Sequence, residues 1–273
     1  MNLRHPAPRR SAFTLVELLA VAAIVGVLAA ILIPVLAAGR AQAGRTSELS
    51  AARQLMVGYH LYAGDHRGML MPGRLPGEAA YNEGGNKVSM NEAATRWPHR
   101  LRPYLGDRFR SVLYVNSQAE HYDRLSREYR GAMLDYLLSL SPSFGLNERF
   151  VGGEGVKRIQ DPVVVRLGDT AAPNRLIAFA STQNRGLGDD SGYFYVEAPA
   201  YWLNNGAFST GTPENEQDYV RGYTAFRHGG RAVVAYLDGH VGLGDVAALR
   251  DMRLWSEQAR LADNPDYRPS LAN

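Results

Sequence analysis

One carboxylate, Glu17, is the single charged side chain in a run of 27 residues from Phe13 to Gly39. A charged side chain near the centre of a bilayer costs roughly 2.5–3.5 kcal/mol on insertion scales, and residues of this kind tend to be kept for a function. Glu17 is therefore the first candidate for a functional side chain. The alternative is a plain signal anchor in which the dipole at the helix N-terminus favours the carboxylate.

A second group of candidates lies near the C-terminus, where His228, Asp238 and His240 fall within one short stretch. Two imidazoles and a carboxylate are the ingredients of a metal site or of general-base chemistry. Asp238-Gly239 is also a two-residue type I′ hairpin signal, in which Asp238 is the turn residue that tolerates a left-handed backbone. We favour this structural interpretation, with His228 hydrogen-bonding across the sheet.

A third candidate is the pair Asp189 and Asp190, in the stretch GLGDDSGY. Carboxylate oxygens are the ligands that calcium prefers, and the neighbouring glycines suit a cation-binding loop. Paired aspartates in a solvated turn are the commoner explanation. Calcium is the one cofactor that the sequence raises; otherwise we expect none.

Signatures of enzymes are missing from the sequence. It contains no Gly-x-Ser-x-Gly elbow, no His-Glu-x-x-His, no phosphate loop and no dinucleotide fingerprint. The Gly-rich stretch VGGEG at 151–155 lacks the Lys-Ser/Thr of a phosphate loop. With no cysteine, the chain can form neither a disulfide nor a thiolate metal site. We therefore expect no enzymatic activity.

The element that must position Glu17 is a long apolar helix. About 20 apolar residues cross a bilayer, so residues 13–39 can span one with some tilt. Arg9 and Arg10 precede the run and would hold the N-terminus in the cytoplasm. A secretory signal peptide has a shorter apolar core of about 7–15 residues, with the small-residue cleavage site after it rather than before.

The basic charge of the chain is concentrated before this helix. The chain has 30 basic and 27 acidic residues, a net charge of +3. Residues 1–12 carry Arg4, Arg9 and Arg10 and no acid, so their removal would leave a formal net charge of zero. The charge therefore gives no reason to expect a nucleic-acid partner.

Past the membrane run, the helix is predicted to continue to Ala63. Leu49, Ala52, Met56, Tyr59 and Ala63 form one stripe at helical spacing. Arg40, Arg45, Glu48 and Arg53 are expected to solvate the other faces, and Gly64 to cap the helix. From Phe13 to Ala63 the helix would have 51 residues and a length of about 76 Å.

The remaining sequence indicates an α+β head with an antiparallel sheet, packed on the long helix. We expect a short helix at 92–105, strands at Ser111–Asn116, Arg175–Ser181 and Gly192–Glu197, and a hairpin of 231–237 with 240–243. Asp245 would cap a helix that runs to about Leu261. The strand from Arg231 to Leu237 is apolar on both faces, which suits burial on two sides.

The run Ala12-Phe13-Thr14-Leu15-Val16-Glu17, with the apolar helix behind it, resembles the N-terminus of type IV pilin-like proteins, including type II secretion pseudopilins. The resemblance implies cleavage between Ala12 and Phe13 by a prepilin peptidase and methylation of Phe13. It implies that Glu17 pairs with the amino terminus of a neighbouring subunit during filament assembly. It also implies that the helix can deform between Gly26 and Pro34. The family usually has Gly before the cut, where this chain has Ala12.

A second resemblance lies in the head. The run from His228 to Gly239 resembles the H-X9-DG element of a large subset of pilin-like proteins, because nine residues separate His228 from Asp238-Gly239. Three other stretches resemble the same subset more loosely: Tyr62–Asp65, Arg102–Leu105 and Ser143–Asn147. That subset often has cysteines, which are absent here.

Together these features predict a lollipop-shaped filament subunit of a pilus or a secretion pseudopilus. It would sit in the inner membrane with its head outside the cytoplasm, and its partners would be the prepilin peptidase/methyltransferase and other pilin-like subunits. The alternative is an anchored binding or adhesive protein that does not polymerise, with loops 64–92 and 183–222 as its ligand surface. The expected divisions are a leader (1–12), a membrane helix (13–39), its amphipathic continuation (40–64), the head (65–262) and a loose tail (263–273).

Overall fold

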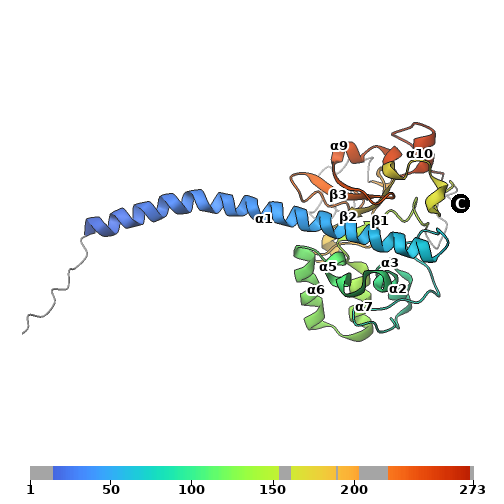
Figure 1. Cartoon of the computed structure of the whole chain (residues 1–273), viewed down its shortest axis with the longest axis horizontal. Coiled ribbons are helices and arrows are strands. Elements are labelled where there is room, and N and C mark those ends of the chain that lie inside the picture. Colours follow the sequence, from blue (N-terminus) through green and yellow to red (C-terminus); the bar gives the residue numbers. More distant parts are fainter. Residues whose placement is uncertain (1–14, 154–160, 189, 203–220, 271–273) are drawn as a thin grey trace, which may run out of the picture. The chain divides into compact units, whose positions relative to one another are not determined.

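The computed structural model describes residues 15–153, 161–188, 190–202 and 221–270. The first element, α1, is a single helix over Leu15–Asp65 (Figure 1). The contacts divide the chain into two units, Met1–Gly44 and Arg45–Asn273, so that α1 contributes to both. The second unit is the globular head, and α1 ends two residues past the predicted Ala63.

Short helices dominate the first half of the head. Where one interrupted helix was expected at 92–105, three short ones occur, and Pro98 and Pro103 lie in the first turns of the second and third. A single-turn 3-10 helix joins α4 to α5. The helices of this half are α2 (Asn91–Thr95), α3 (Trp97–Arg100), α4 (Arg102–Leu105), α5 (Phe109–Leu113), α6 (Ser117–Glu128) and α7 (Gly131–Leu140).

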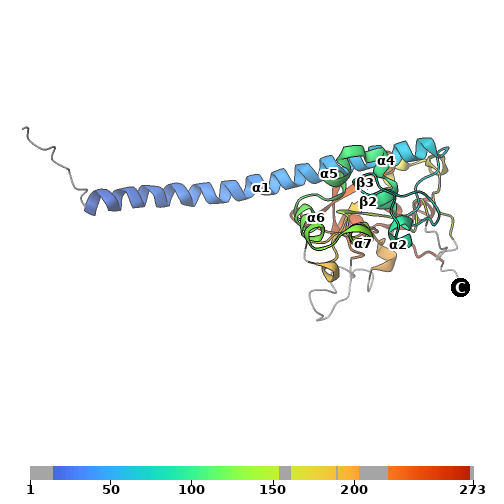
Figure 2. The same cartoon turned by 90° about the horizontal axis from the view of Figure 1, so that it is seen from below.

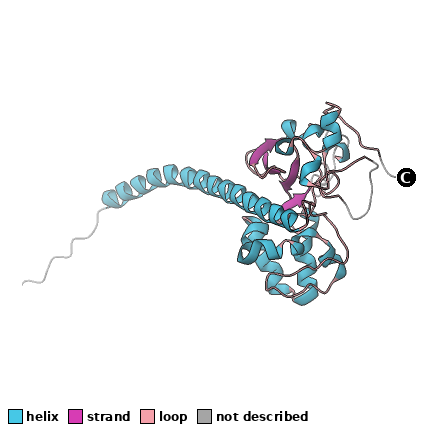
Figure 3. Ribbon diagram, turned by 45° about the vertical axis from the view of Figure 1, so that its right-hand side comes forward, coloured by secondary structure: helices cyan, strands magenta, loops and turns pink. Residues whose placement is uncertain are grey.

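The second half of the head contributes an antiparallel sheet, shown in magenta in Figure 3. Its strands lie in chain order, and each pairs with the next. They are β1 (Phe144–Leu146), β2 (Ile177–Ser181), β3 (Arg231–Tyr236) and β4 (Val241–Asp245). The fold is therefore the predicted α+β type, with an antiparallel sheet and a long N-terminal helix.

Both faces of the sheet are covered. On one face, Tyr59 of α1 packs edge-on against Phe179, with ring centroids 5.2 Å apart. On the other face, Trp255 packs with Ile177 and Val234. Figure 1 shows α9 (Val246–Leu249) and α10 (Glu257–Leu261) on this second side, while the helices of the first half of the head lie on the other side of α1. Figure 2 shows several of these helices, including α4, α5, α6 and α7, from below. The predicted burial of the Arg231–Leu237 strand on two sides is confirmed.

The predicted stripe of α1 faces this core. Ala52, Met56, Tyr59 and Ala63 are buried, and Leu49 is partly buried against them. The prediction that Glu48 lies on a solvated face of the helix is wrong, because Glu48 is fully buried. Its position is four residues before Ala52, one helical turn away on the same face, so the helix geometry places it in the core.

The hairpin between β3 and β4 has a different turn from the predicted one. The Gly239 N–H donates to the Tyr236 carbonyl at 2.9 Å, and the Tyr236 N–H donates to the His240 carbonyl at 2.9 Å. This pattern is a three-residue loop with a bulge, not a two-residue type I′ turn. Gly239 has φ +94°, whereas Asp238 is not left-handed, so Gly239 takes the role assigned to Asp238.

Two predicted strands are absent. Ser111–Asn116 instead overlaps helix α5, because Phe109, Val112 and Leu113 share one buried face at helical spacing. Gly192–Glu197 forms only an isolated parallel bridge between Leu146 and Tyr195. There the hydroxyl of Thr182 takes the place of a partner strand. It accepts a hydrogen bond from the Tyr193 N–H and donates one to the Tyr193 carbonyl. Tertiary packing has overridden local β-propensity in both places.

The predicted C-terminal helix is broken into pieces. Asp245 does cap α9, accepting the Ala248 N–H at 2.8 Å. The carboxylate of Asp251 then accepts the Arg253 N–H at 2.9 Å, and the hydroxyl of Ser256 accepts the Ala259 N–H at 3.4 Å. These side chains start new turns, because short polar residues compete for backbone bonds.

Candidate functional site on the long helix

The membrane-type portion of α1 presents its side chains outward. Among the described residues, α1 is the one helix long and apolar enough to cross a membrane. Its large apolar side chains from Leu15 to Leu36 are all more than half exposed. Glu17 lies in the first turn, where the helix dipole stabilises a carboxylate. The predicted cleavage residues Ala12 and Phe13 lie outside the described residues.

The proposed deformable segment is helical in this structure. Helix α1 runs without interruption through Gly26 and Pro34. Pro34 cannot donate a backbone hydrogen bond to the Ala30 carbonyl, so the helix lacks one of its bonds at this turn. Deformation between Gly26 and Pro34 stays a prediction.

Within the head, Glu48 is the centre of a buried polar cluster. Its Oε2 atom lies 2.8 Å from Nε2 of His228, 3.3 Å from the side-chain nitrogen of Asn116 and 4.0 Å from the guanidinium of Arg227. The Glu48 side chain is completely buried, and that of His228 is 10% exposed. Arg227 also donates to Gln118 at 2.7 Å. His228 thus contacts helix α1, and not the carboxylate or imidazole with which it was grouped in the sequence.

The charges around Glu48 decide its ionisation. Burial alone would raise the pKa of this carboxyl, since a low-dielectric interior disfavours the charged form. Arg227 and His228 act in the opposite direction and hold the pKa of Glu48 below its ordinary value. Glu48 is therefore a buried carboxylate at neutral pH whose charge is compensated by the segment that precedes β3.

A second polar contact joins α1 to the same hairpin. Nε2 of His60 donates to the carbonyl oxygen of Leu237, at 2.8 Å. Leu237 directly precedes the Asp238-Gly239 turn. A side chain at Gly239 would begin 3.2 Å from the His60 ring, so this close approach favours glycine there as well as the positive φ does.

The C-terminal end of α1 is fixed by a third cluster, built around Glu78. The Glu78 carboxylate accepts a hydrogen bond from the Tyr62 hydroxyl at 3.0 Å and one from the Arg100 guanidinium at 2.9 Å. The Arg100 side chain is fully buried. His66 lies 3.2 Å from the same carboxylate. The stretch Tyr62–Asp65 therefore ends the helix within a charged network.

The turn residues Asp238 and His240 form a pair of their own. Nδ1 of His240 lies 2.6 Å from Oδ1 of Asp238, and the His240 N–H donates to the same oxygen at 3.1 Å. Backbone and side-chain bonds from His240 lower the pKa of Asp238 despite the opposing effect of burial. The pair is exposed and structural, as expected for a hairpin turn. His228 does not join it, so the three residues do not form one site.

Asn147 ends the Ser143–Asn147 stretch and has a structural role. Its side-chain nitrogen donates to the carbonyls of Ile177 and Trp255, each at 2.9 Å. Asn147 is fully buried. One amide therefore joins the end of β1 to the start of β2 and to the C-terminal segment.

Of the calcium candidates, only Asp190 falls in the described part of the chain. Its carboxylate lies 3.7 Å from the guanidinium of Arg124. Across the described ranges, no group of three or more His, Asp or Glu side chains is arranged to hold a metal ion. Calcium at Asp189 and Asp190 remains a prediction, because Asp189 lies outside those ranges.

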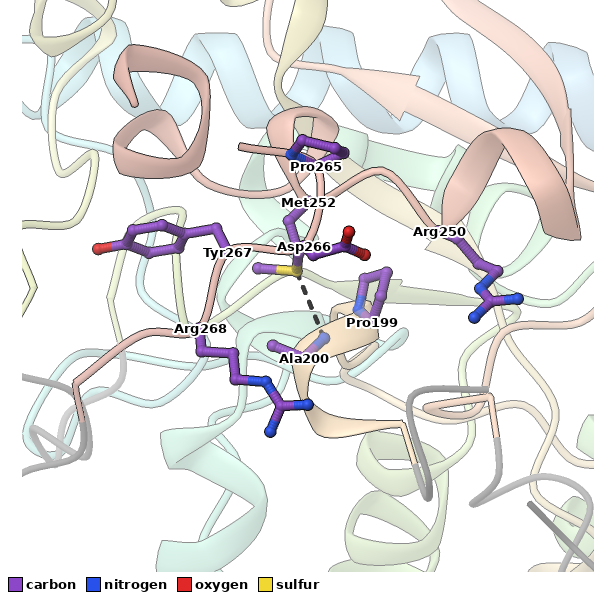
Figure 4. Close-up of a pocket in the computed structure, with 8 residues that line it drawn as sticks. All are labelled: Pro199, Ala200, Arg250, Met252, Pro265, Asp266, Tyr267 and Arg268. Atoms are coloured by element: carbon purple, nitrogen blue, oxygen red, sulfur yellow. Dashed lines mark hydrogen bonds between the residues drawn. The ribbon is translucent and has the colours of Figure 1, made fainter. Parts of the chain in front are cut away.

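A small pocket occurs beside the C-terminal segment (Figure 4). Its volume is about 120 Å³, well below the several hundred Å³ of a typical small-molecule site. The Ala200 N–H bonds the Met252 sulfur across it at 3.4 Å. The segment 263–270, expected to be loose, is held nearby, since the Met252 N–H donates to the Pro265 carbonyl at 2.9 Å and Tyr267 to Asp161 at 2.8 Å. The lining residues are Pro199, Ala200, Arg250, Met252, Pro265, Asp266, Tyr267 and Arg268.

Sequence reasoning missed Glu48, His60 and Arg227 as contacts between α1 and the hairpin. A signal existed for Glu48, because it lies on the apolar stripe at the spacing of a core residue. No comparable pattern marks His60 or Arg227. His60 contacts the Leu237 carbonyl and Arg227 lies 4.0 Å from the Glu48 carboxylate, and both partners are more than 100 residues away in sequence.

Comparison with known proteins bears on the N-terminus alone. No curated protein and no solved structure matches this chain. Residues 8–33 match the profile of the prokaryotic N-terminal methylation motif, a segment that includes Ala12, Phe13, Glu17 and Gly26. The chain therefore carries a prepilin-type signal, which implies processing by a prepilin peptidase in a pilin-like context.

Proposed function

We propose that this chain is a structural subunit of a type IV pilus-like or type II secretion pseudopilus filament. The observation that carries the proposal is the methylation motif at residues 8–33, directly followed by the rest of one long apolar helix. The resemblance of the His228–Gly239 run to the H-X9-DG element of pilin-like proteins supports it further. The proposed role is structural and not enzymatic.

In this proposal the precursor is anchored in the inner membrane with Arg9 and Arg10 in the cytoplasm and the head outside. A prepilin peptidase cuts between Ala12 and Phe13, and Phe13 is methylated. Subunits then associate through their apolar helices, and each Glu17 is neutralised by the amino group of Phe13 in a neighbour. Because a misplaced helix would leave that carboxylate unpaired in an apolar environment, the pairing would also set the register of assembly.

The intact mass of the protein from its native membrane tests the processing step. A mass that begins at Phe13 and carries one added methyl group supports the proposal. A mass that begins at Met1 contradicts it and leaves a signal-anchored protein whose head holds the function.

The variant Glu17→Ala tests the assembly step. We expect it to be inserted and cleaved like the native chain but to form no regular filaments, as judged by electron microscopy of sheared cell-surface fractions. Val16→Ala, a change on the same turn, is the matched control and should assemble. Normal filaments from Glu17→Ala would show that the carboxylate has no assembly role.

The non-polymerising alternative predicts another combination of results. The native chain would be cleaved and methylated, yet no filament would contain it. The loops 64–92 and 183–222 would then be the place to search for a ligand surface.

A further inference from the structure

We propose that the run from His228 to Gly239 is a two-point clamp that fastens helix α1 to the head. One end of the clamp is the bond between His228 and Glu48, and the other is the bond between the Leu237 carbonyl and His60. Both contacts lie within a single chain, so the clamp does not depend on whether the chain polymerises.

The dimensions of the two elements match. Glu48 and His60 are twelve residues apart on α1, which is about 18 Å along a helix. His228 lies beside the start of β3, because it exchanges backbone bonds with Arg231 at 3.0 and 3.3 Å. From Arg231 to Leu237 an extended chain covers about 20 Å. The strand is therefore as long as the helical segment it holds, and the spacing between His228 and the Asp238-Gly239 turn sets that length.

Each end of the clamp has its own specificity. The Glu48 end is electrostatic, since a buried carboxylate needs the charge of Arg227 and the hydrogen bonds of His228 and Asn116. A slip of α1 by one turn would replace Glu48 with Gly44 or Ala52 and move the carboxylate among apolar side chains. The His60 end is steric as well as polar, because a Cβ atom at position 239 would lie only 3.2 Å from the His60 ring.

The test uses the natural lack of cysteine in the chain. Three single-cysteine reporters are introduced at fully buried alanines: Ala52→Cys beside Glu48, Ala63→Cys beside His60 and Ala178→Cys in β2. The rate of maleimide labelling is measured under native conditions on the full chain in detergent micelles. Labelling of a buried thiol reports how often its surroundings open.

His228→Ala is expected to raise labelling at position 52 about tenfold or more, because it removes one partner of a buried charge. Positions 63 and 178 should change much less. His60→Ala is expected to raise labelling at position 63 about fivefold, the effect of one lost hydrogen bond, and to leave position 178 unchanged. His240→Ala is the matched control, since it breaks an exposed imidazole–carboxylate pair in the same hairpin, and no reporter should respond.

Equal increases at positions 52 and 178 in His228→Ala would overturn the clamp, because they would mean that His228 supports the head as a whole. Unchanged labelling at position 52 would overturn it too. If His228→Ala fails to fold, Glu48→Gln replaces it, since it keeps the shape of the side chain and removes the charge. The double variant Glu48→Gln/His228→Ala should label no faster than the faster single variant; additive effects would show that the two residues act separately.

Discussion

At the scale of single residues, Glu48 makes the stability of the head depend on pH. Its pKa is lowered in the folded protein from an ordinary value of 4.5, so folding favours the ionised form. The resulting contribution to stability is complete above that value and is lost as the pH falls through the folded pKa.

We therefore expect the native chain to lose more unfolding free energy than Glu48→Gln between neutral pH and about pH 3.5. Denaturant titrations of both proteins at both pH values, followed by a spectroscopic signal from the head, measure the difference in unfolding free energy. Identical losses in the two proteins would contradict the ionised state assigned to Glu48.

Asn147 is a second residue whose role can be measured alone. Asn147→Ala leaves the carbonyls of Ile177 and Trp255 without their shared donor, and we expect the free energy of unfolding to fall by about 2–4 kcal/mol. Thermal and chemical unfolding followed by near-ultraviolet circular dichroism would show this. Asn264→Ala, at an exposed turn, is the control and should change stability by less than about 0.5 kcal/mol.

At the scale of elements, the contact between α1 and α4 depends on Gly58. A Cβ atom there would lie 2.7 Å from a methyl group of Leu105, whereas Gly64 on the same helix has open space around it. We expect Gly58→Leu to lower the free energy of unfolding by about 1–3 kcal/mol through overpacking.

The matched change Gly64→Leu should be neutral or slightly stabilising, because leucine favours a helix over glycine. The same unfolding measurement on both variants decides the point. Equal effects at positions 58 and 64 would mean that α4 does not pack closely on the helix.

The elements that sequence could predict are those marked by periodicity. The apolar stripe from Leu49 to Ala63 correctly predicted the buried face of α1. The run Arg231–Leu237, apolar on both faces, correctly predicted the buried strand β3. The failures lie where a side chain takes a backbone bond. Thr182 replaces a partner strand beside Tyr193, and Asp251 and Ser256 interrupt the C-terminal helix. The contacts of His60 and Arg227 depend on distant residues, which local patterns do not reveal.

At the scale of the whole molecule, residues 1–12 hold the entire net charge. Removal of residues 1–12 takes away three arginines and no acid, leaving 27 residues of each sign. We expect processing to move the isoelectric point from about 9.1 to near neutrality, which isoelectric focusing of the membrane fraction would show.

Ala12→Gly, which restores the residue usual in pilin-like proteins, should shift more of the protein to the neutral band if Ala12 slows cleavage. Replacing Ala12 with the bulky residue leucine should keep the protein at the basic position. A single basic band in all three proteins would mean that the leader is retained.

The paired contacts at Glu48 and His60 also have a mechanical consequence. A rod attached at one point can pivot about it, while a rod attached at two points some 18 Å apart can neither pivot nor turn about its own axis. Tension applied along the helix would reach both contacts together, so neither could yield first without loading the other. The head portion of α1 is in this sense a rigid mount rather than a hinge.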